Sequence, residues 1–475
     1  MFLPILGPAL SRCGPLRCPR VSCPSGRVNL SRQALNHGGS QVPAQGGRVS
    51  LDGEVYRLKT NWEILRALLL YGICSSPRMV KNASKILHWS QKFLGRRIFK
   101  RTLKATAYGQ FVAGETQAQV VESAARLRRL GVQTMVAVPL EEDVGEGQRE
   151  SWFDNNLQSE LASVDLAKNC GPRPMMQLKV TSLMGADLCA SVSRTLTLPL
   201  ASGFFSPHCL LQAMDGQEFS FPSLTPEENL HFRNSLQRLR TLGEHARGRG
   251  VPLLIDAEMT YLNPCISLIA MTLMLSFNQS QPFIWNTYQC YLKDVERLLS
   301  EDLACASRLG LCFGVKLVRG AYMDRERERA EQCGYPDPIQ KSWEDTNHSY
   351  LKLLDRMLGE VRKEGTRVGL VVATQNEASV QHTLERMEEL EIARDSGAVH
   401  FAQLLGMADH ISLALGTAGY SVYKSLPFGG VDEVIPYLVR RAQENHTALR
   451  GLRREGQLLR GELRRRFLLW TSRHF

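Results

Sequence analysis

Two adjacent arginines, Arg440 and Arg441, stand in the stretch YLVRRAQEN at 437–445. Projected on a helix at about 100° per residue, Tyr437, both arginines and Glu444 fall within an arc of about 120°. The adjoining arc is apolar: Val434, Ile435, Leu438 and Ala442. The arginines therefore border a buried face, where two guanidinium forks suit a single carboxylate. A solvated surface is the usual explanation of such a pair, so the interpretation depends on what surrounds the helix.

Other polar or reactive side chains recur where short apolar runs end: Lys179, Asp256, Glu258, Gln289, Arg319, Tyr322, Thr374 and Gln375. One such residue alone is usually solvated or structural, but their recurrence on run after run favours a functional site. No glycine fingerprint competes, because GEG at 145–147 is followed by Glu150 where the third glycine should stand. A dinucleotide would therefore bind in a non-Rossmann manner.

Eight apolar runs rich in Val, Ile and Leu predict the strands that would position these residues: 132–138, 176–183, 251–258, 283–289, 313–320, 368–374, 398–405 and 420–426. Charge-striped helical segments such as Thr346–Lys363 and Glu377–Glu391 separate them. Strands alternating with helices indicate a parallel sheet, and eight such units indicate a closed (β/α)8 barrel of the α/β class. The catalytic face of such a barrel is the one at which its strands end. Pro436 is expected in the first turn of its helix, after the Gly429–Gly430 loop.

The predicted domain organisation has four parts. Residues 1–50 contain no Asp or Glu and several arginines, which indicates a mitochondrial transit peptide; a merely disordered basic arm is the alternative. Residues 51–130 are expected to form a helical subdomain, and 131–445 the barrel, with an insertion at about 184–250. Residues 446–475 form a basic helical tail, which could lie on an anionic membrane or dock on the body.

Composition excludes several classes of protein. The net charge of +11 lies largely at the two ends, which argues against a nucleic-acid-binding body. No apolar run reaches the roughly 20 residues of a membrane span, so any membrane contact is peripheral. The 12 cysteines have neither C-x-x-C pairs nor zinc-ligand spacing, which predicts free thiols, no metal site and a reducing compartment.

Six longer motifs closely resemble those of the proline dehydrogenase family: FVAGET (111–116), DAEMTYLNP (256–264), WNTYQCYLKD (285–294), KLVRGAYM (316–323), QLLGMADHIS (403–412) and PYLVRRAQEN (436–445). The resemblance covers roughly residues 50–450 of the chain. It implies a distorted (β/α)8 barrel that holds FAD in its mouth, oxidises a C–N bond of a cyclic imino acid and passes the electrons to a quinone. The composition of the N-terminus separately predicts import into the mitochondrial matrix, and the basic tail allows contact with the inner membrane.

The resemblance assigns roles to named residues. Arg440 and Arg441 would bind the substrate carboxylate, with Lys179 adding charge, and Asp256 would pair with the arginines. The substrate ring would be walled by Tyr322, Leu404 and Tyr437. The cofactor would be held by Gln289, Lys316, Val318, Gly320, Ala321, Met323, Thr374, Gln375 and Glu444. Small residues at 320–321 would let a flat isoalloxazine approach the backbone.

Two positions depart from the family pattern on the cofactor side. Gln375 stands where many members carry a histidine, and Lys316 replaces an arginine of many bacterial members, which loses a bidentate fork.

The expected reaction is hydride transfer to flavin from the carbon beside a neutral ring nitrogen, so the rate should rise with pH.

Ser425, two residues before Pro427, departs from the family pattern on the substrate side. Members that oxidise proline carry a tyrosine there, and serine leaves space and polarity for a ring hydroxyl. The predicted substrate is trans-4-hydroxy-L-proline, oxidised to Δ1-pyrroline-3-hydroxy-5-carboxylate. If water or neighbouring side chains fill the space, L-proline is the substrate instead.

Two other classes of function stay open from the residues alone. An aldolase-like lyase would use Lys179 as a Schiff base. A non-enzymatic binding protein would use the basic ends. Neither would hold a flavin, so a yellow purified protein would separate them from a dehydrogenase.

Overall fold

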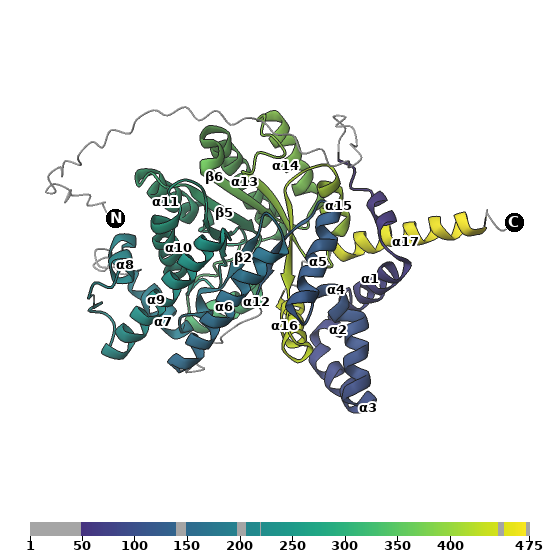
Figure 1. Cartoon of the computed structure of the whole chain (residues 1–475), viewed down its shortest axis with the longest axis horizontal. Helices are drawn as coiled ribbons and strands as arrows, with labels where there is room; N and C mark the ends of the chain where they lie inside the picture. The colour runs from purple at the N-terminus through teal and green to yellow at the C-terminus, as the bar shows by residue number, and fades with distance from the viewer. Residues whose placement is uncertain (1–48, 139–148, 197–205, 219, 445–450, 472–475) are drawn as a thin grey trace. The chain divides into compact units, whose positions relative to one another are not determined.

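The computed structural model describes residues 49–138, 149–196, 206–218, 220–444 and 451–471 (Figure 1). The chain divides into residues 1–48 and a compact unit from Val49 to Phe475, and all described residues belong to the second. The predicted transit peptide therefore falls almost wholly outside the described residues.

Eight parallel strands close into a barrel in the order β1 to β8, with β8 pairing back onto β1. Their bounds are Gln133–Ala137, Met175–Leu178, Leu253–Ile255, Ile284–Gln289, Phe313–Val318, Val368–Ala373, Val399–Leu404 and Val422–Pro427. Each strand overlaps one of the eight apolar runs, although β2 begins one residue before its run and β8 ends one residue after its run, so the predicted barrel is confirmed. The runs are mostly apolar because a barrel strand is buried on both faces.

One set of alternate strand residues fills the barrel interior at its N-terminal end: Met135, Met175, Leu254, Trp285, Val371, Ala402 and Tyr423. The indole of Trp285 is the largest of these side chains, and it lies against Gly314 and Gly369. A Cβ atom at Gly314 would lie 2.7 Å from the indole, and one at Gly369 would overlap it. Both glycines therefore make room for Trp285.

Helices surround the barrel: α6 (Glu150–Cys170), α7 (Ala186–Leu196), α8 (Pro207–Met214), α9 (Pro226–Arg249), α10 (Asn263–Phe277), α11 (Val295–Arg308), α12 (Met323–Cys333), α13 (Trp343–Glu364), α14 (Glu377–Glu389), α15 (Asp409–Thr417) and α16 (Val431–Glu444). The connection between β2 and β3 holds α7, α8 and α9, where the sequence predicts an insertion. Helix α9 packs on α6 as a crossover helix does, whereas α7 and α8 both pack on α10.

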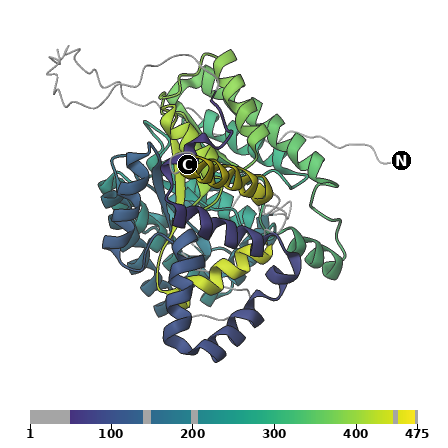
Figure 2. The ribbon, with the colours of Figure 1, turned by 90° about the vertical axis from the view of Figure 1, so that its right-hand side faces the viewer.

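The segment before the barrel is helical, with α1 (Asn61–Cys74), α2 (Pro77–Lys81), α3 (Ala83–Leu103), α4 (Gly109–Phe111) and α5 (Gln117–Arg129). Helix α5 packs on β1 and α6 and so covers the barrel. The C-terminal helix α17 (Gly451–Thr471) packs on α1, as Figures 1 and 2 show. Leu452 and Leu459 of α17 are buried there, so this part of the tail docks on the body. Among the described residues, no helix has the length and hydropathy of a membrane span.

The prediction for Pro436 is wrong. Helix α16 begins at Val431, so Pro436 lies inside the helix as its sixth residue rather than in the first turn. The helix starts early because the carbonyl of Gly430 accepts hydrogen bonds from the backbone N–H groups of Glu433 and Val434, at 3.1 and 2.9 Å. Pro436 is exposed and lacks an N–H, so α16 forgoes one backbone hydrogen bond there.

Candidate active site

Above the apolar layer, the inward-facing positions of the barrel become polar. Counting in steps of two from the inward apolar residues places a second set of residues toward the C-terminal ends of the strands. These are Gln177, Lys179, Asp256, Gln289, Lys316, Val318, Leu404 and Ser425. Residues from six strands or the positions just after them thus converge on the end of a (β/α)8 barrel that carries active sites.

Lys316 and Asp256 form an ion pair inside the barrel. The Lys316 side chain is buried, and its Nζ donates to Oδ1 of Asp256. The family resemblance had assigned Asp256 to the arginines of α16, so the observed partner differs from the predicted one. Asp256 follows β3 and Lys316 lies on β5, so only β4 separates them, and this proximity over one strand is not visible in the sequence.

Gln289 belongs to a hydrogen-bonded network at the start of α10. Its Nε2 donates to the carbonyl of Glu258 at 3.1 Å, and its Oε1 accepts from Nδ2 of Asn263 at 3.0 Å. The Glu258 carboxylate accepts from the hydroxyl of Thr181, and burial raises the pKa of Glu258 while the charge of Lys179 opposes that rise. Gln289 is thus held in one orientation by the loop after β3 and by the first residue of α10.

Cationic and aromatic side chains meet at Tyr322, just before α12. The Arg441 guanidinium lies 5.2 Å from the centre of the Tyr322 ring and 5.7 Å from that of Tyr437, and its Nη2 donates to the Tyr322 hydroxyl at 3.3 Å. Burial raises the pKa of Tyr322, and the charges of Lys179 and Arg441 oppose that rise. Positive charge from β2 and from α16 therefore reaches the same tyrosine.

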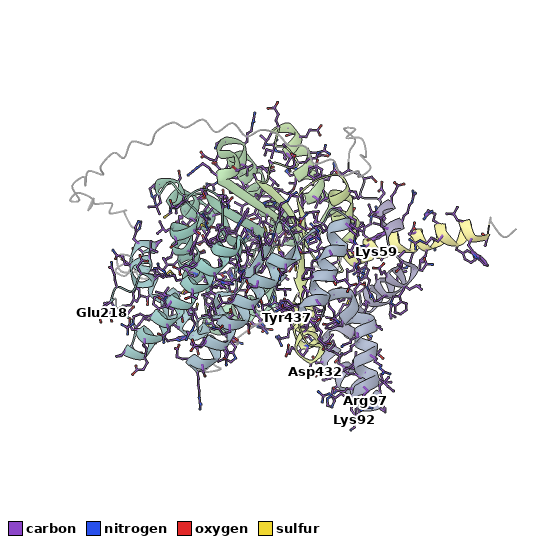
Figure 3. The ribbon with its side chains drawn as sticks, viewed as in Figure 1. Lys59, Lys92, Arg97, Glu218, Asp432 and Tyr437 are labelled. Atoms are coloured by element: carbon purple, nitrogen blue, oxygen red, sulfur yellow. The ribbon has the colours of Figure 1, made fainter. Side chains whose placement is uncertain are left out.

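Helix α16 presents two faces. Val434 and Ile435 are buried against α3 and the segment that follows it, whereas Tyr437, Arg440 and Arg441 are half-buried. Figure 3 labels Tyr437 and Asp432 on this helix; Asp432 pairs with Lys100 and Arg96 of α3. The side chain of Glu444, at the last position of α16, lies outside the described part of the chain.

Ser425 lies on β8 with only 6% of its surface exposed. Its hydroxyl is hydrogen-bonded to the side-chain amide of Gln177 on β2. Leu404, the neighbour of Ser425 across the β7–β8 ladder, keeps 49% of its surface exposed. Sequence reasoning missed Gln177 because it looked only at strand ends, although an inward position two residues before Lys179 would have indicated it.

Thr374 and Gly320 have structural partners that the sequence did not suggest. Arg319 donates to the hydroxyl of Thr374 at 2.5 Å and to that of Ser379 at 2.8 Å. Gly320 has φ +134°, and a Cβ atom there would collide with the ring of Tyr291. Glycine is therefore required at 320 by Tyr291 itself, independently of the predicted approach of an isoalloxazine.

The remaining predicted cofactor residues lie at the same rim. Val318, at the end of β5, and Ala321 are half-buried, as is Met323, the first residue of α12. Gln375 is also half-buried, and its Nε2 lies 3.8 Å from Sδ of Met407. Among the described residues, no His, Cys, Asp and Glu group could hold a metal ion.

Comparison with known proteins assigns this chain to one class of oxidoreductase. The proline dehydrogenase family profile matches residues 120–454. The chain belongs to the proline dehydrogenase family, which confirms the resemblance seen in its motifs.

Full-length relatives cover most of the chain. It is 52% identical to hydroxyproline dehydrogenase of Xenopus laevis, over 89% of this chain and 91% of that protein. It is 45% identical to human hydroxyproline dehydrogenase, over 90% and 95%. Identity to human mitochondrial proline dehydrogenase 1 is 31%, over 97% of each. Among solved structures, proline utilization A from Bdellovibrio bacteriovorus, inactivated by N-propargylglycine, shares the fold with a TM-score of 0.59 and 19% identity, over 83% of this chain and 38% of that one.

The residues at the rim fit a flavin. An isoalloxazine is flat and largely apolar, with carbonyl and N–H groups along one edge. Val318, Ala321 and the exposed Leu404 offer apolar surface, while the amide of Gln289 and the ammonium of Lys316 offer donors beside it. Both polar groups keep hydrogen-bonding capacity beyond their contacts in the protein.

Proposed function

We propose that this chain oxidises trans-4-hydroxy-L-proline to Δ1-pyrroline-3-hydroxy-5-carboxylate, using bound FAD and delivering the electrons to a quinone. The observation that carries the proposal is the small, buried hydroxyl of Ser425 at an inward position of the polar layer. The relatives named hydroxyproline dehydrogenase, at 44–52% identity, support the same substrate. The family match disfavours a Schiff-base lyase and a non-enzymatic binding protein.

Arg440, Arg441 and Lys179 bind the substrate carboxylate in this proposal. Supporting it, Arg441 and Lys179 come from distant parts of the chain and both act on Tyr322. Charge-assisted hydrogen bonds to a carboxylate are about twice as strong as neutral ones, so these residues fix the substrate's orientation. Asp256 pairs with Lys316 of β5 inside the barrel.

Tyr322, Tyr437 and Leu404 pack against the substrate ring and exclude water from it. Leu404 supports this role because a large apolar side chain, 49% exposed at the end of β7, gains from being covered by a ligand. The cations around the carboxylate also disfavour protonation of the substrate nitrogen, because that would add a further positive charge beside them. They therefore favour the neutral amine, from which oxidation proceeds.

The residues proposed to hold FAD are Gln289, Lys316, Val318, Gly320, Ala321, Met323, Thr374, Gln375 and Glu444. When bound, FAD supplies the acceptor for the hydride that leaves the ring carbon beside nitrogen. Gln289 is fixed by Asn263 and Glu258, and Thr374 by Arg319, so both offer their remaining hydrogen-bonding capacity in a set direction.

We also propose that the enzyme acts in the mitochondrial matrix, in peripheral contact with the inner membrane. The acid-free, arginine-containing N-terminus supports import. Exposed apolar side chains support membrane contact: Trp62, Leu65, Leu69 and Ile73 on α1, and Phe467, Leu468, Leu469 and Trp470 on α17. Co-sedimentation with cardiolipin-containing vesicles tests it: Phe467→Asp/Trp470→Asp should lose binding, and equal binding by variant and wild type would contradict it.

One experiment tests the catalytic proposal. The purified protein should be yellow, release FAD on denaturation and show a higher kcat/KM for trans-4-hydroxy-L-proline than for L-proline with a soluble quinone. A preference for L-proline, giving Δ1-pyrroline-5-carboxylate, would replace the proposed substrate. A protein that neither contains nor takes up FAD would overturn the flavoenzyme proposal.

A further inference from the structure

We infer that Gln177 is a specificity-determining residue that acts together with Ser425, and that this pair binds the ring hydroxyl of the substrate. The inference rests on the proposed function, because it names the group that reads the hydroxyl. It concerns a residue in the middle of β2 that no strand-end pattern or shared motif singles out.

The contact between Gln177 and Ser425 crosses a whole strand. Gln177 pairs in register with Ala137 of β1, and Ser425 pairs with Met135 of the same strand. All four residues share the inward-facing alternation, so the glutamine reaches diagonally over β1 to the serine hydroxyl, 248 residues away in sequence. Ala137 presents only a methyl group, which leaves space for that reach.

The pair has unused hydrogen-bonding capacity. The serine hydrogen is donated to Oε1 of Gln177, and the serine oxygen keeps lone pairs to accept. Within the described part of the chain, Nε2 of Gln177 makes no hydrogen bond, so it keeps two donors. A hydroxyl group is both a donor and an acceptor, and the pair offers it one partner of each kind. Turning the amide over exchanges the two roles but still leaves one donor and one acceptor.

The pair also lies at a suitable place relative to the proposed carboxylate site. Lys179 is two residues beyond Gln177 on the same inner wall, which corresponds to about 6.6 Å along a strand. That separation is comparable to the width of a five-membered ring with substituents on opposite sides. A substrate whose carboxylate meets Lys179 therefore presents its far ring substituent to Gln177 and Ser425.

Proline lacks the hydroxyl and leaves the pair's donor and acceptor without a ligand partner. A site built to hydrogen-bond a substrate group discriminates strongly against the analogue that lacks it, because its buried polar atoms are then unsatisfied. Removing the glutamine amide should consequently affect the two substrates differently. A purely structural role of Gln177 would affect them alike.

The test compares kcat/KM for trans-4-hydroxy-L-proline and L-proline in the flavin-loaded wild type, Gln177→Met and Gln177→Ala. We expect Gln177→Met to lower the hydroxyproline value on the order of 10-fold to 100-fold and to leave the proline value within about threefold. The matched control is Gln133→Met. It replaces an inward glutamine at the N-terminal end of β1, away from the proposed substrate site, and should leave the ratio of the two kcat/KM values unchanged. Gln177→Ala gives the same readout if the methionine variant does not fold.

A double-mutant cycle sharpens the test. If the two residues act as one unit, Gln177→Met/Ser425→Ala should lower the substrate ratio no further than the stronger single variant. If Gln177→Met lowers kcat/KM equally for both substrates, or leaves their ratio unchanged, the inference is overturned. The proposed function still stands in that case, provided that the wild type prefers hydroxyproline. A wild type that prefers proline would instead overturn the proposed function itself.

Discussion

The two ends of the barrel interior are built on opposite principles. At the N-terminal end, Met135, Leu254, Trp285 and Tyr423 form an apolar plug in which Gly314 and Gly369 fit around one indole ring. At the C-terminal end, the inward positions of the barrel carry Lys316, Asp256, Gln177 and Ser425. Only two residues of strand separate the two layers, yet one layer is held by shape and the other by charge and hydrogen bonds.

This difference separates stability from chemistry within one barrel. The apolar layer gains from burial and close packing, which need no ligand. The polar layer holds charges that are costly to bury unless they are paired, and it offers hydrogen-bonding capacity that a substrate or cofactor can use. Substitutions in the first layer should therefore change stability, and those at the polar rim should change activity or charge balance.

Asp409 at the start of α15 should give the largest effect on stability. It accepts from Lys424 at 2.8 Å and Lys59 at 2.5 Å; burial raises the pKa of its carboxyl, but both lysines outweigh that and hold the pKa well below its usual value. The stability this gives is present above the unfolded-state pKa and is lost as pH falls. Asp409→Asn leaves the ammonium groups of Lys424 and Lys59 without their shared anionic partner. It should therefore lower the free energy of unfolding by about 3–5 kcal/mol.

Urea unfolding at neutral pH measures this cost. The matched control is Asp432→Asn, since Asp432 also binds two cations, Lys100 and Arg96, but is exposed and should change little. Equal effects of the two substitutions would show that burial of the Asp409 cluster does not matter.

Arg440→Met and Arg441→Met should give the largest effect on activity. Losing one charge-assisted contact to a carboxylate should cost about 1.5–3 kcal/mol, or roughly 10-fold to 150-fold in kcat/KM, with the flavin still bound. Arg233→Met, at an exposed position of α9, is the control. Near wild-type kcat/KM in both active-site variants would remove the carboxylate role.

Gly369→Ala probes the apolar layer. The added methyl group would overlap the Trp285 indole, and overpacking of this kind costs about 1–3 kcal/mol of stability. Gly359→Ala in α13 is the control, because its methyl group would meet nothing within 4 Å and should stabilise the helix slightly. Thermal unfolding of both variants, with Trp285→Phe added to rescue the first, checks the fit. If Gly369→Ala unfolds like wild type, the plug is less tightly packed than described.

Glu160 on α6 should give an effect on stability that depends on pH. Burial raises the pKa of its carboxyl to about 8, and the Ser182 hydroxyl opposes the rise. A raised pKa gives stability that is fully present below the unfolded-state pKa and is lost as pH rises toward 8. Glu160→Gln keeps an acceptor for Ser182 without a charge, so it should be more stable than wild type near pH 9 and similar near pH 5. Glu122→Gln, at an exposed position, is the control, and its stability relative to wild type should not depend on pH. If Glu160→Gln also shows no dependence on pH, the Glu160 carboxyl is ionised in the folded protein and the prediction is wrong.

The strands could be predicted because apolar runs are a local property of the sequence. The partners of the inward residues could not, since they depend on which side chains meet over an intervening strand. Lys316 with Asp256 and Ser425 with Gln177 are such pairs, and neither follows from spacing along the chain. The predicted start of α16 is too late, because proline is common in a first turn and Pro436 was assigned to it. The helix in fact begins at Val431, where the Gly430 carbonyl accepts the first backbone hydrogen bonds.

The most direct test of the proposed function is anaerobic reduction of the bound flavin, with no electron acceptor present. On mixing with trans-4-hydroxy-L-proline, we expect the flavin absorbance to bleach in a single turnover and Δ1-pyrroline-3-hydroxy-5-carboxylate to form, faster than with L-proline at the same concentration. A flavin that stays oxidised with hydroxyproline, or that bleaches faster with L-proline, would contradict the proposal.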